Sequence, residues 1–331
     1  MKLKLFILLT LTFILIGCKN EIPTQNEVRV ISYNLQNFFD AEDNGCEYEE
    51  FQEGSKLWND QKYEKRVDRL FELLKTFPFS SSSVIFFEEI ENDGILKTLL
   101  VKGLAKRGFL YYGCVNSGTP LSIGFISKIK PNAITSNATD SSRAVLGFET
   151  LINNEQVIIY AIHAKSQLGD VEEGKRERKK LASLLKFLVQ DRAETHIIIL
   201  GDFNEQFSVN SGLDNGYVPV GVYSKTEIDD ALSLAITGDE RRLENGVLYS
   251  PFLDSSVSLN CEGTYYYKGE WSFLDNVLLS SSLKDDNGLE FKKFYVINNE
   301  ELLDNGIPYR YDMEKGKGYS DHLPLCIELG W

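Results

Sequence analysis

The sequence lacks an excess of positive charge. Its 331 residues carry 35 Lys and Arg against 49 Asp and Glu, which gives a formal net charge of −14. An acidic surface repels the phosphate backbone, so this composition argues against tight, non-specific DNA binding through a basic face. It does not exclude a nuclease, because a bound metal ion and a few local Arg or Lys side chains are enough to handle one phosphate at a time.

Cysteine is also scarce, and no two cysteines are spaced as CxxC. Besides Cys18, the chain has only Cys46, Cys114, Cys261 and Cys326, at irregular intervals. This spacing argues against a metal–thiolate site. An exported protein can form disulfides, and the sequence leaves the state of these four cysteines open.

No apolar run at the N terminus is long enough to cross a membrane as a helix. Residues 5–16 fall short of the ~20 that a span requires, but they suit the core of a signal peptide. The run ends in Leu15-Ile16-Gly17-Cys18, which resembles a bacterial lipobox. We therefore predict a lipoprotein signal peptide over residues 1–17, lipidation of Cys18 and a polar tether over residues 18–27. A plain secretory signal followed by a chance Cys is the alternative.

From residue 28 onward the chain shows no second linker and no internal repeat, so we expect one domain over residues 28–331. Runs rich in Val, Ile, Phe and Tyr predict strands at residues 28–35, 83–90, 122–127, 144–152, 157–163, 196–200, 273–279, 291–297 and 323–329. Apolar residues at helical spacing predict helices around residues 63–74 and 181–188, with a weaker one over 228–235. Many strands with few helices favour a layered α/β protein with a core of two sheets.

Polar side chains gather where the strand-like runs end, which is where a rigid scaffold presents its working groups. Asn34 ends the first run, Glu89 ends the second, and His163 ends the run 157–163. Asp202 follows the run 196–200, and Asp321 precedes the last run. Burying many carboxylates and amides without partners is costly, and a hard divalent cation with oxygen ligands is a partner for several of them at once.

Six short segments, taken in their order along the chain, resemble the endonuclease/exonuclease/phosphatase superfamily with its DNase I-like fold. They are Ser32-Tyr33-Asn34-Leu35-Gln36-Asn37-Phe38-Phe39, Glu88-Glu89-Ile90-Glu91-Asn92, Ile159-Tyr160-Ala161-Ile162-His163-Ala164-Lys165-Ser166, Gly201-Asp202-Phe203-Asn204, Leu274-Asp275 and Ser320-Asp321-His322. Each segment alone is common, but six in family order make the resemblance specific from about residue 28 to the C terminus. It implies a four-layer α-β-β-α sandwich of two packed mixed sheets flanked by helices.

The resemblance also implies a divalent metal site, for Mg²⁺ or Mn²⁺ with Ca²⁺ as an alternative. Glu89 and Asp321 resemble the metal-binding carboxylates, and Asn34 resembles the amide that supports metal and phosphate. Asp202 resembles the group that orients or deprotonates the attacking water. Asn204 resembles the amide that holds phosphate oxygens.

Four further residues complete the expected site. His322 resembles the catalytic His on the scissile phosphate, and Asp275 the carboxylate that fixes its tautomer. His163 matches a second His of the nuclease-like and sphingomyelinase-like branches. Arg143 resembles their phosphate-contacting Arg. His196, at the start of a strand, is expected to be structural.

Two features of the site stay open at this level. Glu88 stands where the family normally has Gln, which adds a charge beside the metal-binding Glu89. The family's phosphate-contacting Tyr has no clear counterpart, and Tyr111 and Tyr112 are candidates only.

The expected enzyme is a metal-dependent phosphoric ester hydrolase, most simply an exported, lipid-anchored nuclease acting on DNA or RNA. A phospholipid, sphingomyelin, nucleotide or sugar phosphate is the alternative substrate, and a non-catalytic surface lipoprotein is the third hypothesis. The aromatic segment 264–271 is expected either to stack bases or to be an exposed strand or loop. We expect a monomer in the cell envelope, held to a membrane through Cys18 and facing the periplasm or the exterior.

Overall fold

The structure, a computed structural model, describes residues 26–116, 119–138, 143–167, 169–190, 192, 195–207 and 234–331. The expected signal peptide, Cys18 and nearly all of the tether lie outside these residues. Among the helices that the structure describes, none is long and apolar enough to cross a bilayer.

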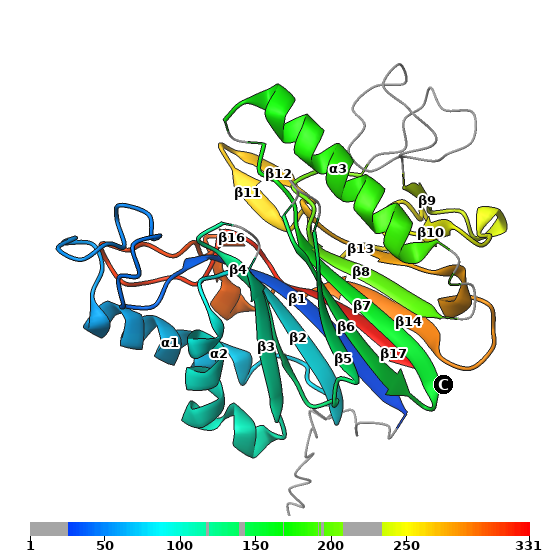
Figure 1. Ribbon diagram of the computed structural model, residues 1–331, viewed down its shortest axis with the longest axis horizontal. Coiled ribbons are helices and arrows are strands. Elements are labelled where there is room, and N and C mark those ends of the chain that lie inside the picture. The colour runs from blue at the N-terminus through cyan, green and yellow to red at the C-terminus, as the bar shows by residue number, and fades with distance from the viewer. Residues whose placement is uncertain are drawn as a thin grey trace, which may run out of the picture.

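Two mixed sheets form the centre of the molecule (Figure 1). The six-stranded sheet has the order β14-β17-β1-β2-β4-β3. Its strands are β1 (Glu27–Phe38), β2 (Ser82–Ile90), β3 (Tyr111–Asn116), β4 (Ser122–Ser127), β14 (Glu290–Val296) and β17 (Leu325–Gly330). The seven-stranded sheet has the order β5-β6-β7-β8-β13-β10-β9. Its strands are β5 (Ala133–Asn137), β6 (Val145–Ile152), β7 (Glu155–His163), β8 (His196–Asp202), β9 (Ala235–Thr237), β10 (Val247–Tyr249) and β13 (Asp275–Leu279).

Helices cover the outer faces of both sheets (Figure 1). Helices α1 (Asp60–Leu74) and α2 (Asp93–Leu99) lie on the six-stranded sheet, and α3 (Val171–Val189) lies on the seven-stranded one. Two small hairpins complete the fold, one from β11 (Tyr265–Tyr267) and β12 (Glu270–Ser272), the other from β15 (Leu303–Asp304) and β16 (Ile307–Pro308). The expected four-layer α/β sandwich is thereby confirmed.

Strand β7 shows why the sequence builds this arrangement. Successive side chains of a strand point to opposite faces. Ile158, Tyr160 and Ile162 pack with α3, whereas Ile159 and Ala161 belong to the core between the sheets. A strand that is buried on both faces needs a continuous apolar run, and this is what made β7 recognisable in the sequence.

All of the expected strands are present, within a few residues at either end. Helix α1 is capped by Asn59, whose side chain accepts from the amide of Lys62. Of the helix expected over residues 228–235, residues 228–233 lie outside the described residues. The predicted end of this helix is wrong, because Ala235 begins strand β9. The edge strands β3 and β5 and the short helix α2 had not been expected.

Candidate active site

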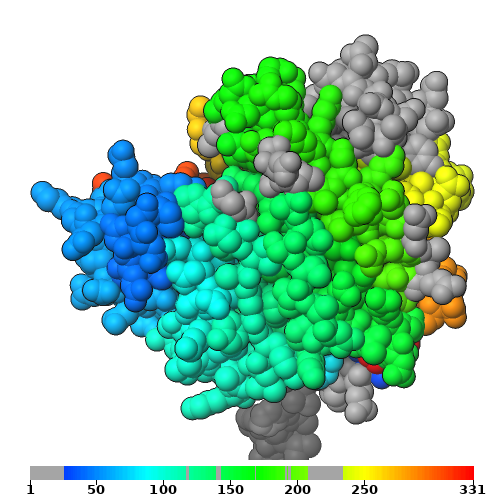
Figure 2. Space-filling view, in the orientation of Figure 1, coloured from blue at the N-terminus to red at the C-terminus, as the bar shows by residue number. Residues whose placement is uncertain are grey.

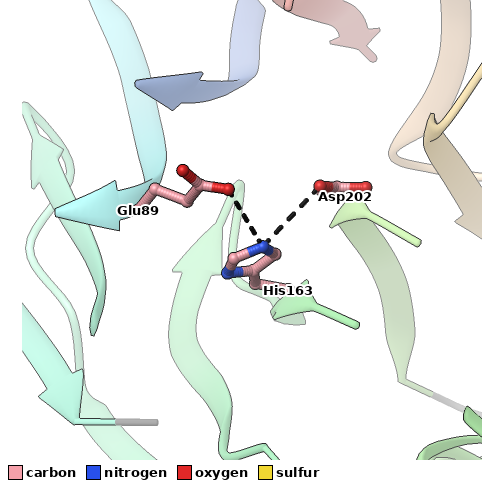
Figure 3. Close-up of side chains that lie close together, drawn as sticks. All are labelled: Glu89, His163 and Asp202. Carbon is pink, nitrogen blue, oxygen red and sulfur yellow. Dashed lines mark ion pairs between the residues drawn. The ribbon is translucent and has the colours of Figure 1, made fainter. Parts of the chain in front are cut away.

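The carboxyl ends of four strands meet at one end of the sandwich and bring the main polar residues together. Strands β1 and β2 are parallel neighbours in one sheet, and β7 and β8 are parallel neighbours in the other. Asn34 lies near the end of β1 and Glu89 near the end of β2. His163 and Asp202 are register partners at the ends of β7 and β8. Figure 3 shows Glu89, His163 and Asp202 pointing toward one another from three separate strands.

Strands β1 and β2 of the six-stranded sheet are both distorted near their carboxyl ends. The β1–β2 register shifts between Asn34 and Phe38, and Gln36, Asn37 and Glu89 have φ angles of 51°, 52° and 60°. Such angles are unfavourable for residues with a Cβ and persist where surrounding contacts hold them. The backbone amide of Asn37 donates to Glu89 Oε2 at 2.7 Å. The distortion therefore aims the Glu89 carboxylate at the strands of the other sheet.

A buried arginine holds the distorted segment of β1 through its backbone carbonyls. The Arg66 guanidinium, from α1, donates to three consecutive backbone carbonyls, those of Leu35, Gln36 and Asn37. It also lies 3.9 Å from the centroid of the Tyr311 ring and 4.4 Å from that of Phe38. Burial lowers the pKa of Arg66 to about 10, which leaves it charged. Helical spacing alone gave no sign of this role.

The carboxylates and the imidazole form a compact set of ligand atoms. His163 Nε2 is 3.3 Å from Glu89 Oε1 and 3.7 Å from Asp202 Oδ2, and all three ligand atoms lie within 4.8 Å of one another. Asn34 Nδ2 bridges the carboxylates, at 3.1 Å from Glu89 and 3.2 Å from Asp202. Two carboxylate oxygens and an imidazole nitrogen at this spacing suit a divalent cation such as Mg²⁺ or Mn²⁺.

Burial and charge separate the protonation behaviour of the two carboxylates. Burial opposes ionisation of Glu89, but the hydrogen bond with His163 and nearby positive charge outweigh it and lower the pKa of Glu89 to about 2. Burial raises the pKa of Asp202 to about 7, with a further contribution from the charge of Asp275. Burial and the charge of Arg143 lower the pKa of His163, so its neutral imidazole is able to act as a ligand. A carboxylate poised near neutrality suits proton transfer.

The turn after β8 is fixed by its own side chains. Asn204, with φ of 50°, donates its backbone amide to Asp202 Oδ1 at 2.7 Å and its side-chain amide to Asp202 Oδ2 at 2.9 Å. Gly201 has φ of 129°, and a Cβ there would lie 2.1 Å from the carbonyl oxygen of Ile162. Glycine is required at this position because β7 passes so close to β8.

A second pair of residues stands beside the first cluster. His322 Nδ1 is 2.7 Å from Asp275 Oδ2, and both side chains are buried. Burial acts to lower the pKa of His322, but the charge and hydrogen bond of Asp275 and the charge of Asp202 raise it well above its usual value. Ser320 Oγ donates to the carbonyl of Asn34 at 2.6 Å and ties this segment to the end of β1.

Two predicted residues lie at the periphery of the cluster. Asp321 is not one of the three close ligand groups, and Arg310 Nη2 lies 3.7 Å from its Oδ2. Arg143 donates through Nη1 to the backbone carbonyl of Ala164 at 3.2 Å, next to His163. The roles assigned to them by resemblance stay predictions.

The remaining candidates are placed elsewhere. Tyr111 pairs with Ser127, which pairs with Val84 near the start of β2, so Tyr111 and its neighbour Tyr112 are far from Glu89 at the other end of that strand. They are therefore wrong candidates for a phosphate contact. His196 lies outside the site, with Nε2 2.6 Å from Glu155, as its expected structural role requires.

The aromatic segment forms a hairpin on the rim of the site. The Tyr265 ring centroid is 4.7 Å from that of His322, and Tyr265 and Tyr267 stack with centroids 6.2 Å apart and an interplanar angle of 24°. Thr264 anchors the hairpin by accepting the amide of Asp275 through Oγ1 and the amide of Leu323 through its carbonyl. The contact between Tyr265 and His322 is one that the sequence did not predict.

Known proteins share both the sequence pattern and the fold. A family model described as endonuclease/exonuclease/phosphatase family matches residues 29–330. No curated protein sequence matches the chain.

Solved structures show the fold at low sequence identity. The structure of D. rerio TDP2 complexed with single-strand DNA product is 15% identical, with a TM-score of 0.55, and the match covers 92% of this chain and 99% of that one. Truncated Caenorhabditis elegans TDP2 is 13% identical, with a TM-score of 0.53 and coverage of 92% and 98%. A beta toxin structure from Staphylococcus aureus is 15% identical, with a TM-score of 0.51 and coverage of 90% and 98%.

Proposed function

The chain belongs to the endonuclease/exonuclease/phosphatase family, and we propose that it is an exported nuclease that hydrolyses DNA or RNA phosphodiesters. The broader class follows from the family itself: the protein is a phosphoric ester hydrolase, of a family in which dependence on a divalent metal is typical. The substrate and the exported, lipid-anchored state belong to the proposal.

One observation carries the proposal. The Glu89–His163–Asp202 cluster and the Asp275–His322 pair, which come from five separate strands and loops, stand side by side at one end of the sandwich. Hydrolysis of a phosphodiester needs charge neutralisation, an activated water and a donor to the developing negative charge. These residues supply groups for all three.

The cluster fits a divalent cation on the chemistry of its donors. Glu89 and His163 would hold the ion, with Asp202 beside it, and Asn34 Nδ2 already ties the two carboxylates together. When bound, the ion would supply positive charge to the phosphate oxygens. Burial and the negative charges of its neighbours raise the pKa of Asp202. A bound cation would offset this negative charge.

The chain's own residues account for proton movement and orientation. Asp202, buried and tied by Asn204, is positioned to accept a proton from the attacking water. His322, kept charged by Asp275, donates from Nε2 to a phosphate oxygen, because its Nδ1 is already engaged. Glu89 stays ionised at neutral pH and so remains a ligand.

The aromatic hairpin favours nucleic acid among the candidate phosphate esters. Bases stack on aromatic side chains without regard to sequence, and Tyr265 and Tyr267 present stacked rings that lead outward from His322. The same fold accommodates a single-strand DNA product in D. rerio TDP2. We propose single-stranded nucleic acid as the preferred form.

The setting is proposed from the N-terminal residues alone. A basic start, an apolar run and Cys18 are the features of a bacterial lipoprotein signal. The enzyme would act as a monomer, tethered in the cell envelope and facing the periplasm or the exterior.

A substrate panel tests the proposal. The domain from residue 26 is incubated with Mg²⁺ or Mn²⁺ and single-stranded DNA, plasmid DNA, RNA, sphingomyelin or nucleotides. Nucleic-acid cleavage that is lost in EDTA and in Asp202→Ala, but kept in the surface control Asp239→Ala, supports it. Release of a lipid head group or of inorganic phosphate without cleavage of nucleic acid would refute the nuclease, and turnover of no substrate would favour a non-catalytic lipoprotein.

A further inference from the structure

One long stretch of the acidic chain contains no acidic residue. Residues 94–139 lack Asp and Glu, although the whole chain carries 49 of them. The same stretch contains six basic residues, Lys97, Lys102, Lys106, Arg107, Lys128 and Lys130. Its described parts, residues 94–116 and 119–138, form most of α2 and all of β3, β4 and β5, and we call them the basic lobe. Figure 2 shows the lobe as the cyan and teal surface at the lower left.

The exposed basic end of this lobe lies opposite the active site. Strand β3 begins at Tyr111, beside Ser127, and Ser127 pairs with Val84 near the start of β2. Glu89 lies at the other end of β2. The basic end of the lobe and the active site therefore lie at opposite ends of β2 and are separated by the length of this strand (Figure 1).

The same end of the lobe adjoins the point where the chain enters the domain. Lys128 Nζ donates to the carbonyl of Ser80 at 2.6 Å, and Ser80 Oγ donates to the carbonyl of Glu27 at 3.3 Å. Glu27 begins β1, directly after the proposed tether. A lipid anchor ahead of residue 26 would therefore hold this end of the molecule nearest the membrane.

The lobe exposes both apolar and basic side chains. Val101 is 79% exposed and Leu110 65% exposed, and Lys106, Arg107 and Lys130 are also exposed. Within the described residues these three cations form no ion pair. Exposed apolar side chains among unpaired cations are typical of surfaces that rest on anionic bilayers, where the cations meet head groups and the apolar groups enter the interface.

We propose that the basic lobe docks on an anionic phospholipid surface. Charge complementarity and the neighbouring tether point to a membrane. A nucleic acid bound here would lie at the far end of the molecule from Asp202 and His322, out of reach of the catalytic groups. The docking is confined to the lobe, because the other half of the same end has mixed charge: Glu155, Asp285, Asp286 and Glu290 lie there together with Lys284 and Lys292.

Docking in this way fixes the orientation of the enzyme. The active site faces away from the bilayer, toward water, so its substrates are soluble phosphate esters rather than lipids of the membrane it rests on. This inference rests on the proposed function and on the proposed exported, lipid-anchored state. Vesicle binding is measured without substrate, so failure of the docking and failure of the nuclease are distinguishable.

Vesicle co-sedimentation tests the docking. Residues 26–331 contain every described strand, helix and core cluster, so this domain is used without the leader. We expect it to bind vesicles of phosphatidylcholine with phosphatidylglycerol, to release in about 0.5 M salt because surface charges are screened, and not to bind phosphatidylcholine alone.

Charge reversal in the lobe provides the decisive comparison. The double variant Lys106→Glu, Lys130→Glu should lose at least tenfold in binding to the anionic vesicles, since each cation near such a surface contributes to the attraction. The matched control Lys56→Glu, Lys65→Glu reverses two exposed cations elsewhere and should bind within twofold of the unaltered domain. Both doubles should cleave a soluble oligonucleotide equally well.

Three results would overturn the proposal. They are absence of binding to anionic vesicles by the unaltered domain, equal losses in the lobe variant and the control, and binding of nucleic acid rather than vesicles through Lys106 and Lys130. Val101→Ser with Leu110→Ser gives an independent readout: it should weaken vesicle binding while leaving its salt dependence in place.

Discussion

Replacing Glu88 with Gln should stabilise the metal-free protein increasingly as pH rises. Glu88 is fully buried; Ser32 Oγ donates to its Oε1 at 2.7 Å, and its Oε2 has no hydrogen-bond partner among the described residues. Burial raises the pKa of Glu88 well above its ordinary value, with help from the charges of Asp275 and Asp202. The folded protein therefore keeps this proton at neutral pH, whereas the unfolded chain releases it.

The sign and size of the effect follow from this difference in bound protons. The folded state binds more protons, so wild-type stability is fully present below the unfolded pKa and is lost as pH rises toward the folded pKa. Each pH unit in that interval costs about 1.4 kcal/mol. Gln matches the shape of the protonated acid and does not titrate. The stability difference between Glu88→Gln and wild type should thus grow by roughly 3 kcal/mol from pH 5 to pH 7.

Urea unfolding in EDTA at pH 5, 6, 7 and 8 measures this difference. The control is Glu64→Gln, which changes an exposed carboxylate on α1 in the same way and should give a difference independent of pH. A difference for Glu88→Gln that stays flat across this range would mean that Glu88 is ionised in the folded protein, and the reasoning would fail.

Asp275→Asn should lower kcat on the order of a thousandfold and move the alkaline limb of the pH–rate profile to lower pH, because Asp275 raises the pKa of His322; an unmoved limb would contradict the pairing. Arg66→Met should cost about 3 kcal/mol of unfolding free energy in urea, since three backbone carbonyls lose a charged donor; a loss below about 1 kcal/mol would show that the cation contributes little. Tyr265→Ala should raise KM for a single-stranded oligonucleotide about tenfold through loss of stacking, and an unchanged KM would remove the hairpin from substrate binding.

The sequence was sufficient to locate the strands that carry the site. Strands β7 and β8 are buried on both faces, so their apolar runs are continuous and their ends are marked by polar residues. Strands β3 and β5 lie at sheet edges, where exposed positions such as Tyr112 and Ile134 interrupt any simple pattern. Residue patterns detect two-sided burial well and edge strands poorly.

The helix α2 was missed for a related reason. It has only seven residues, too few for a helical repeat to be distinctive, and its N-cap is Asn92. Glu91, just before the helix, is buried and accepts the backbone amide of Asp40 at 2.7 Å. Burial raises the pKa of Glu91 to about 7.

The sequence predicted the residues that form the cluster, but not the residues that pack around it and hold it in place. Motif order identified Glu89, His163 and Asp202, and the structure brings their ligand atoms together. Arg66 and Tyr265 act through contacts that are made only after folding, with partners far away in the chain, so local pattern could not reveal them. The structure pairs none of the four cysteines of the described residues, Cys46, Cys114, Cys261 and Cys326, in a disulfide.

The rate of cleavage of a single-stranded oligonucleotide, measured against Mg²⁺ concentration for wild type and Glu89→Gln, tests the central claim most directly. Wild type should show saturable, EDTA-sensitive cleavage. The variant keeps the shape of the side chain but loses its negative charge, and it should be slower by about a thousandfold at every Mg²⁺ concentration while unfolding cooperatively in urea. Cleavage by Glu89→Gln at the wild-type rate, or wild-type cleavage that persists in EDTA, would contradict a metal-dependent phosphodiesterase centred on Glu89, His163 and Asp202.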